Sequence, residues 1–458
     1  MASVRAMERR RGRSIGLLAI LLLAFGPIPG SAGVSAQAAT VLTEGTPRQA
    51  EVSTAGLDVA FGFVQLRVDR RLFPGAVVLV ARHGIVVGSR AFGVMERGSS
   101  EPMTTDAIFD QESITKVLST APVVLALVED GTLALNDPVA RYLPDFAVNG
   151  KEAITIREML AYSAGLPGDA QFLENPDDAA VWKEMAETPL EYQPRTMVEY
   201  SDLTYRLLGR VIEAATGRSL ADVTREKIWA PLGMTDTMYN PPASLTPRIA
   251  GTGYSELRGR TMRGEVADEQ DYALGGVAGC DGVFSSARDL AILGQTMLNG
   301  GSYGDASVLS ADTVVAMIAN QTPWVDAATA DTDPLANLLF TPKGYGWELA
   351  TPRFSHGGTK LSEHAYGKAG GAGTFMWVDP ATDLVAVYLT NHGLPVPFDE
   401  AGWNDMLDRI APDQFFNLVA TALDPVPASP AGETPPGGTP ATGEATPVAA
   451  LADRFRHA

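Results

Sequence analysis

Runs of apolar residues near both ends of the chain predict β-hairpins. The first hairpin pairs residues 76–81 with 85–89, and the second pairs residues 374–378 with 384–390. In each pair, turn-forming residues such as glycine, proline and aspartate separate the two runs. We therefore expect one sheet that is built from segments far apart in the sequence.

The middle of the chain has the three-to-four-residue apolar spacing of helices. Three such runs cover residues 117–128, 203–215 and 290–297, and each is soon followed by a glycine that can end a helix. Strands at the two ends and helices between them predict a sheet-containing lobe with a mainly helical insert. A cleft between the two lobes is then the expected place for a site.

The N-terminus has the order of a secretory signal peptide. An arginine-rich region over residues 5–13 precedes an apolar run over residues 15–25, and small residues follow at 36–38. The apolar run is about half the roughly 20 residues that a membrane-spanning helix needs. We expect residues 1–38 to be a cleavable signal peptide of a secreted or cell-envelope protein without a stable membrane span. An uncleaved anchor is the alternative.

The rest of the chain divides by composition into three parts. Residues 39–56 are small and polar, and we expect a short lead-in there. Residues 57–423 carry the periodic segments and predict one globular domain. Residues 424–458 are rich in proline, glycine and threonine and have few large apolar side chains, which predicts a disordered tail.

Charge and cysteine content narrow the possible functions. The formal net charge is −19, and an acidic surface repels phosphate backbones, so we expect no nucleic-acid partner. Cys280 is the only cysteine, so it cannot form an intrachain disulfide and is expected to be a buried thiol. The five histidines lack metal-site spacing, so no metal or cofactor is expected. The sequence gives no indication of the oligomeric state.

A candidate nucleophile occurs just before the first apolar helical run. Ser113-Ile114-Thr115-Lys116 places a serine and a lysine three residues apart, and residues at this spacing share one face of a helix. A helix N-terminus also favours the negative charge that develops on an attacking oxygen. The alternative is an ordinary helix start with a surface lysine. No G-x-S-x-G is present, so the nucleophile elbow of α/β-hydrolases is not supported.

Two further segments place reactive or cationic groups beside small residues. Tyr200-Ser201-Asp202 precedes the second helical run, and a tyrosine near an ammonium group can relay protons. The alternative there is a helix N-cap with Tyr200 as a packing residue. Residues 368–371, Lys-Ala-Gly-Gly, place a cation and small residues at a strand edge, where a substrate can approach the backbone. The alternative is a glycine-rich turn.

Together, the three motifs and their surroundings resemble the serine β-lactamase and penicillin-binding superfamily, in particular its class C-like branch with esterases and D-aminopeptidases. The resemblance spans about residues 57–420 and includes FDQESITKVLSTAPVVLALVEDG from position 109 and YSDLTYRLLGRVIEAATG from position 200. It implies an α+β fold with an antiparallel sheet flanked by helices, an α/β/α sandwich, and an inserted mainly helical lobe.

The resemblance also implies an acyl-enzyme mechanism. Ser113 would attack a carbonyl group while Lys116 and Tyr200 share the removal of its proton. The backbone N–H groups of Ser113 and Gly371 would form the oxyanion hole. Substrate would contact four residues of the second and third motifs, namely Asp202, Lys368, Ala369 and Gly370.

Three departures from the family pattern bear on function. Asp202 stands where Asn is usual, and a carboxylate beside Lys116 favours a charged lysine and shifts the base role toward Tyr200. Ala369 stands where Thr is usual, which deletes a hydroxyl that helps to hold a lactam carboxylate. Lys368 is retained, so an anionic substrate is not excluded. Finally, Pro122 lies inside the first helical run, where it should kink the helix.

The expected function is that of an exported serine hydrolase that cleaves an ester or amide in a small or peptide-like substrate, in the manner of an esterase or a D-amino-acid peptidase. The alternatives are a β-lactamase and a penicillin-binding-type protein that is acylated without efficient turnover. A chromogenic ester assay beside a β-lactam assay discriminates among these classes.

Overall fold

The structure is a computed structural model that describes residues 38–168, 178–324, 342–351, 355–395 and 400–423. The predicted signal peptide, apart from its last residue, and the predicted tail over residues 424–458 lie outside the described residues. No helix among the described residues combines the length and the apolar character that crossing a membrane requires.

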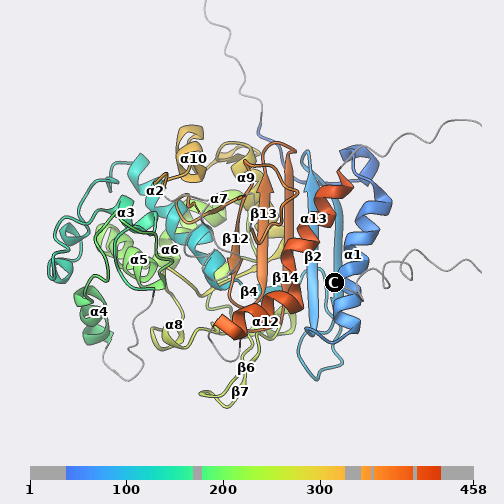
Figure 1. The fold of residues 1–458 in the computed structure, drawn as a ribbon, viewed down its shortest axis with the longest axis horizontal. Helices are drawn as coiled ribbons and strands as arrows, with labels where there is room; N and C mark the ends of the chain where they lie inside the picture. Colours follow the sequence, from blue (N-terminus) through green and yellow to red (C-terminus); the bar gives the residue numbers. More distant parts are fainter. Residues whose placement is uncertain (1–37, 169–177, 325–341, 352–354, 396–399, 424–458) are drawn as a thin grey trace, which may run out of the picture. The chain divides into compact units, whose positions relative to one another are not determined.

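A seven-stranded sheet joins the two ends of the domain (Figure 1). Its strands, in spatial order, are β1 (Thr43–Glu44), β3 (Ile85–Gly93), β2 (Gly75–Arg82), β14 (Leu384–Thr390), β13 (Thr374–Asp379), β12 (Tyr366–Gly370) and β11 (Glu348–Leu349). All neighbours are antiparallel except β1 and β3. The hairpins β2–β3 and β13–β14 are those predicted from the sequence, and β14 pairs with β2, which confirms that distant segments share one sheet.

Alternate side chains of the sheet pack on opposite faces, as the two-residue period of a strand requires. On one face, Val78 and Val80 join Phe415 and Phe416 in a core beneath the helices α1 (Thr54–Asp69), α12 (Glu400–Ile410) and α13 (Pro412–Ala422). On the other face, Val77 and Leu79 join a second core that includes α9 (Ala287–Leu298). The sheet is therefore covered on both sides, which confirms the predicted α/β/α arrangement (Figure 1).

The segment between β3 and β11 supplies the mainly helical insert (Figure 1). The α-helices described within it are α2 (Ala121–Glu129), α3 (Ile156–Leu160), α4 (Asp178–Glu187), α5 (Asp202–Thr216), α6 (Leu220–Thr224), α7 (Ala230–Leu232), α8 (Glu269–Ala273), α9 and α10 (Ala311–Ile318). Three predicted runs correspond to α2, α5 and α9. The 3-10 turns of the described chain are η1 (Pro47–Ala50), η2 (Glu112–Ile114), η4 (Val139–Arg141), η5 (Pro144–Phe146) and η7 (Ala243–Arg248), and its π turns are η3 (Lys116–Thr120) and η6 (Arg225–Trp229).

Among its described residues, the insert also contains three small sheets. They are formed by β4 (Ile108–Asp110), β8 (Val283–Ser286) and β5 (Met238–Tyr239), by β6 (Tyr254–Ser255) and β7 (Arg260–Thr261), and by β9 (Ser302–Tyr303) and β10 (Ala306–Ser307). The first of them matters most for function, because β4 runs directly into the segment that carries Ser113. Its pairing with β8 fixes the entry of that segment.

The lead-in segment contributes to the sheet. Thr43 and Glu44 form β1, which pairs in parallel with Ile85 and Val86 of β3. The Thr46 side chain then caps η1 in a capping box with Gln49. A two-residue strand has too few positions for a period to be visible, which explains why composition alone indicated only a polar lead-in.

The position of Pro122 has a local structural explanation. Proline lacks an N–H, so within a regular helix it would leave the carbonyl oxygen of Leu118 without its donor. In the structure, the π turn η3 precedes α2, and Pro122 lies in the first turn of α2. The indole N–H of Trp229 donates to the Leu118 oxygen at 2.8 Å. The chain thus changes from a π turn to an α-helix at the place where the sequence predicted a kink.

Candidate active site

Ser113 lies in the 3-10 turn η2, immediately after β4. The backbone N–H of Gln111 donates to the Val283 oxygen at 2.9 Å, which continues the β4–β8 pairing up to this turn. The preceding residue, Glu112, has a φ of 47°, in the left-handed region that costs free energy for a residue other than glycine. Such strained conformations concentrate at functional sites, and here the strain is adjacent to the candidate nucleophile.

Lys116 contacts Ser113, as the three-residue spacing predicted. Its Nζ lies 2.9 Å from Ser113 Oγ, 2.6 Å from Asp202 Oδ1 and 3.2 Å from the Cys280 carbonyl oxygen. Lys116 is 0% exposed, so the alternative of a surface lysine is wrong. Burial acts to lower the pKa of the Lys116 ammonium, but Asp202 and Asp281 raise this pKa well above its usual value. Lys116 is therefore a charged donor, as expected from the aspartate beside it.

Ser201 and Asp202 have different roles at the start of α5. The Ser201 side chain accepts a hydrogen bond from the Thr204 N–H at 3.0 Å and is the N-cap. This leaves the Asp202 carboxylate to pair with Lys116. Burial acts to raise the pKa of Asp202, but Lys116 and Arg206 lower it below its usual value. The N-cap interpretation of this segment is thus correct for Ser201 and compatible with a functional Asp202.

The ring of Tyr200 lies between two ammonium groups. Lys116 Nζ is 5.1 Å and Lys368 Nζ is 4.4 Å from the ring centroid, and the ring stacks on Tyr162 at 5.2 Å. Burial raises the pKa of the phenol, while the two lysines act to lower it. Within the described part of the chain, no hydrogen bond joins the Tyr200 hydroxyl to Ser113. Tyr200 is therefore a protonated phenol whose anion would have two cations beside it.

Strand β12 brings the third motif to the same place. Lys368 Nζ lies 3.0 Å from Glu348 Oε1, and His356 Nδ1 lies 2.9 Å from Glu348 Oε2. Lys368 is 0% exposed, and burial acts to lower its pKa whereas Tyr200 and Glu348 raise it. The cation that the sequence placed at a strand edge thus has a carboxylate counter-charge of its own.

The small residues after Lys368 allow β12 to approach the Ser113 turn closely. A Cβ on Gly370 would lie 2.3 Å from the Gln111 carbonyl oxygen, so only glycine fits there. Thr374 Oγ1 donates to the same oxygen at 3.2 Å. Among the described residues, the N–H groups of Ser113 and Gly371 donate to no other protein group, so both are available to a substrate oxygen.

A cavity of about 370 Å³ opens beside Ser113. This volume suits a small-molecule site. All of the predicted site residues except the buried Lys116 line this cavity, namely Ser113, Tyr200, Asp202, Lys368, Ala369, Gly370 and Gly371. The lining also includes Glu112, Glu199, Asp268, Asp281, Glu348, His356, Phe375, Leu394 and Trp403. The three motifs, up to 258 positions apart in the chain (Ser113 to Gly371), therefore meet at one place.

Sequence reasoning identified Asp202 but missed the other acidic residues of this cavity. Asp281 accepts a hydrogen bond from Ser113 Oγ at 3.3 Å. Glu199 is half-buried, and its pKa is raised to about 6, mainly by burial and to a smaller extent by the nearby Glu191. Burial and Asp110 raise the pKa of Glu112 well above its usual value. None of these residues belongs to a spaced motif, and only their positions in the folded chain reveal them.

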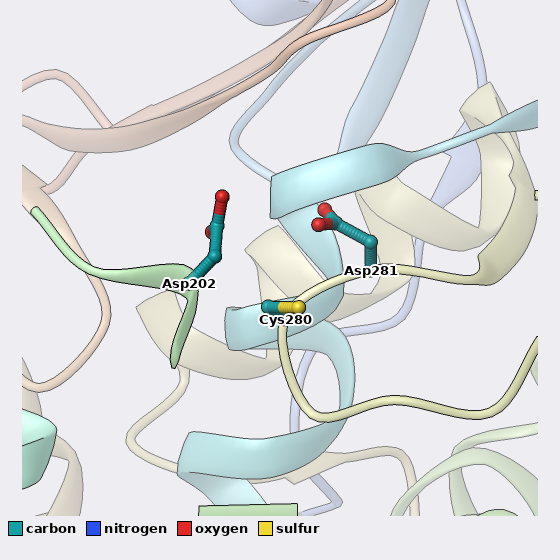
Figure 2. A group of neighbouring side chains, drawn as sticks. All are labelled: Asp202, Cys280 and Asp281. Carbon is teal, nitrogen blue, oxygen red and sulfur yellow. The ribbon is translucent and has the colours of Figure 1, made fainter. Parts of the chain in front are cut away.

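Two acidic clusters next to the site have protein cations as counter-charges. Figure 2 shows Asp202, the first residue of α5, and Cys280 with Asp281 on a loop. Lys116 pairs with Asp202, while the neighbouring cluster of Asp268, Asp271 and Asp281 has Arg206 at 2.6 Å from Asp271. The Cys280 thiol donates to Asp271 at 2.9 Å, and burial raises its pKa well above the usual value. Cys280 is a buried thiol, as predicted.

Comparison with known proteins identifies a family. The family model described as Beta-lactamase matches residues 62–409. A protein of Escherichia coli (strain K12) named "Putative D-alanyl-D-alanine carboxypeptidase" is 32% identical over 401 residues, which cover 79% of this chain and 88% of that protein.

Solved structures have the same fold. An octameric penicillin-binding protein homologue from Pyrococcus abyssi aligns with a TM-score of 0.60 and 22% identity, over 80% of this chain and 77% of that one. A family VIII carboxylesterase aligns with a TM-score of 0.60 and 20% identity, over 79% of this chain and 98% of that one. At these identities the likeness is one of fold, and it agrees with the fold class predicted from the sequence.

Proposed function

The chain belongs to the beta-lactamase family and is a hydrolase of that family, and from this premise we propose that it is an exported serine hydrolase that cleaves ester or amide bonds through a Ser113 acyl-enzyme. The observation that carries the proposal is the 2.9 Å contact between Lys116 Nζ and Ser113 Oγ at the wall of the cavity. Export rests on the basic and apolar order of residues 1–38, which lie almost wholly outside the described residues.

In the proposed reaction, Ser113 Oγ forms a bond to the substrate carbonyl carbon while its O–H bond breaks and the proton passes to the carboxyl group that the hydroxyl faces. The N–H groups of Ser113 and Gly371 stabilise the oxyanion, and each such donor typically contributes about 10²- to 10³-fold to turnover. The Lys116 ammonium stabilises the negative charge that develops on Ser113 Oγ. The Tyr200 phenol gives its proton to the leaving oxygen or nitrogen, since Lys116 and Lys368 stabilise the resulting phenolate. Water then releases the acyl group.

The charge of the cavity favours a substrate without a carboxylate near Lys368. Glu348 pairs with Lys368 at 3.0 Å, so this cation is already compensated. Glu199 and Asp202 add carboxyl groups to the wall. A neutral ester or amide with a small acyl group therefore fits the site better than an anionic one.

A D-alanyl-D-alanine carboxypeptidase is the second candidate, because of the relative with that name and because Lys368 lines the cavity. The test compares a short-chain aryl ester, a peptide ending in a free D-alanine carboxylate, and the same peptide with an amidated end. The proposal expects the ester to have the highest kcat/KM. Faster cleavage of the free-carboxylate peptide than of both others would favour the carboxypeptidase.

β-Lactams are expected to be poorer substrates than simple esters. Asp202 replaces the family's amide donor and Ala369 lacks the family's hydroxyl, and each matched hydrogen bond contributes about 0.5–1.5 kcal/mol. In the double variant Asp202→Asn with Ala369→Thr, the ratio of kcat/KM for a cephalosporin to that for an aryl ester should rise by about 10- to 100-fold. Using the ratio removes any general loss of turnover that follows from weakening the Lys116–Asp202 pair.

The single variant Ala369→Thr is the matched control, since it adds the hydroxyl and keeps the ion pair with Lys116 intact. It should shift the ratio in the same direction and by less. A parent enzyme that already prefers the cephalosporin would contradict this expectation, as would a double variant with an unchanged ratio.

A further inference from the structure

The two hydrogen bonds of Ser113 Oγ have opposite directions. Lys116 Nζ donates to this oxygen at 2.9 Å, because a charged ammonium has no lone pair. The Ser113 hydroxyl donates its own proton to Asp281 Oδ1 at 3.3 Å. In the resting site, the proton that must leave Ser113 during attack therefore already faces a carboxyl group.

Lys116 is poorly suited to receive this proton. Its ammonium has three acceptors within 3.2 Å, namely Ser113 Oγ, Asp202 Oδ1 and the Cys280 carbonyl oxygen. An ammonium has three protons, so the three acceptors match its whole capacity. Deprotonation would leave Asp202 as a buried carboxylate without its cation, which is unfavourable.

Regular structure holds Asp281 in position. Its neighbour Cys280 accepts from Lys116 through its carbonyl oxygen, and the N–H of Val283 donates to Thr115 Oγ1 at 3.0 Å. Val283 begins β8, which pairs with β4 on the other side of Ser113. The loop that carries Asp281 is therefore connected to the chain on both sides of Ser113, through β8 and β4 before it and through Thr115 and Lys116 after it. A precise catalytic geometry requires such support.

The surroundings of Asp281 suit a proton acceptor. The residue is 2% exposed, and burial raises the pKa of its carboxyl well above the usual value. Lys116 acts in the opposite direction, while Asp202, Asp271 and Asp268 raise this pKa further. A general base works best when its pKa is near the working pH, and these groups move an aspartate in that direction.

We infer that Asp281 is a catalytic residue that accepts the proton of the Ser113 hydroxyl during acylation; this inference rests on the proposed function. As the bond from Ser113 Oγ to the carbonyl carbon forms, the O–H bond breaks and the proton moves to Asp281. The bond to the leaving group then breaks, and the leaving atom takes the proton of Tyr200. In deacylation, water gives a proton to the Tyr200 phenolate and attacks the acyl carbon. Asp281 returns its proton to Ser113 Oγ as that oxygen departs.

The first test is the variant Asp281→Asn, which keeps the shape of the side chain and an acceptor oxygen but cannot hold the proton. We expect kcat to fall by about 10²- to 10⁴-fold, the usual contribution of a general base. Activity of the parent should rise with pH through the raised pKa of Asp281, because only the carboxylate accepts a proton. This acidic limb should be absent in Asp281→Asn.

The matched control is Asp289→Asn. Asp289 is a buried aspartate outside the cavity, and burial is the main reason why its pKa is raised to about 6. Asp289 accepts from Thr237 Oγ1 at 2.8 Å and does not line the cavity. This control should keep the acidic limb of the parent. A folded Asp281→Asn protein that retains the limb, or loses less than about threefold in kcat, would overturn the inference.

The second test uses the unmodified protein and stays informative if Asp281→Asn does not fold. The rate at which a fluorophosphonate labels Ser113 is measured against pH. We expect this rate to rise with pH as a carboxyl group ionises at acidic or near-neutral pH. Tyrosine and lysine side chains ordinarily ionise at about pH 10 and 10.4. A labelling rate that rises only in that range would overturn the assignment of Asp281. No label on Ser113 at any pH would instead contradict the proposed function itself.

Discussion

Ser113→Ala is expected to lower kcat for an aryl ester by about 10⁴-fold or more, because it removes the oxygen that forms the acyl-enzyme in the proposed mechanism. The Ser113 side chain is small and only partly buried, and its loss leaves Lys116 with Asp202 and the Cys280 oxygen as acceptors. The thermal midpoint should therefore stay close to that of the parent. Steady-state kinetics and thermal unfolding of the same preparation measure both quantities.

The control for this variant is Ser307→Ala, which changes an exposed serine in the β9–β10 hairpin, outside the cavity. It should keep both kcat and the thermal midpoint. If Ser113→Ala retained more than about one tenth of the parent kcat in a folded protein, another nucleophile would carry the reaction and the assignment of Ser113 would be wrong.

Lys116→Met is expected to lower both activity and stability. Methionine fills a similar volume without a charge, so it leaves Asp202 and Asp281 without the cation that compensates them. Removing one partner of a buried ion pair typically costs about 3–5 kcal/mol in the free energy of unfolding. We expect a loss of about 3 kcal/mol, together with a fall in kcat of about 10³-fold because Ser113 Oγ loses its charged donor. Denaturant unfolding and ester hydrolysis measure the two effects.

A second substitution separates the two effects of this change. Adding Asp202→Asn to Lys116→Met removes the carboxylate that the first change left uncompensated, so part of the lost stability should return. Activity should not return, because the donor to Ser113 Oγ is still missing. Recovery of both would mean that Lys116 acts only through stability, and recovery of neither would contradict the direct pairing of Lys116 with Asp202.

Local patterns were sufficient to predict the hairpins, the three long helical runs and the contact between Ser113 and Lys116. Each depends on residues close in sequence, where strand alternation and helical spacing act directly. The π turn η3 was not predictable, because it depends on the distant indole of Trp229 as well as on Pro122. The strand β1 was not predicted because the strand with which it pairs in the described part of the chain lies about forty residues later.

The second half of the site depends on contacts that a single sequence does not reveal. Asp281 lies 168 positions from Ser113, within a short loop that has no spaced motif. The pairing of Glu348 with Lys368 and His356 likewise forms only when β11 and β12 meet. The sequence therefore indicated the proposed nucleophile and its lysine, whereas the charge balance around them could be seen only in the fold.

Mass mapping of a fluorophosphonate-labelled protein tests directly whether Ser113 is the nucleophile. Active enzyme is treated with the reagent, digested, and the modified peptide is identified together with the residual ester hydrolysis. We expect one label on Ser113, in proportion to the lost activity, and no label in Ser113→Ala. A label on another residue, or loss of activity without modification of Ser113, would contradict it.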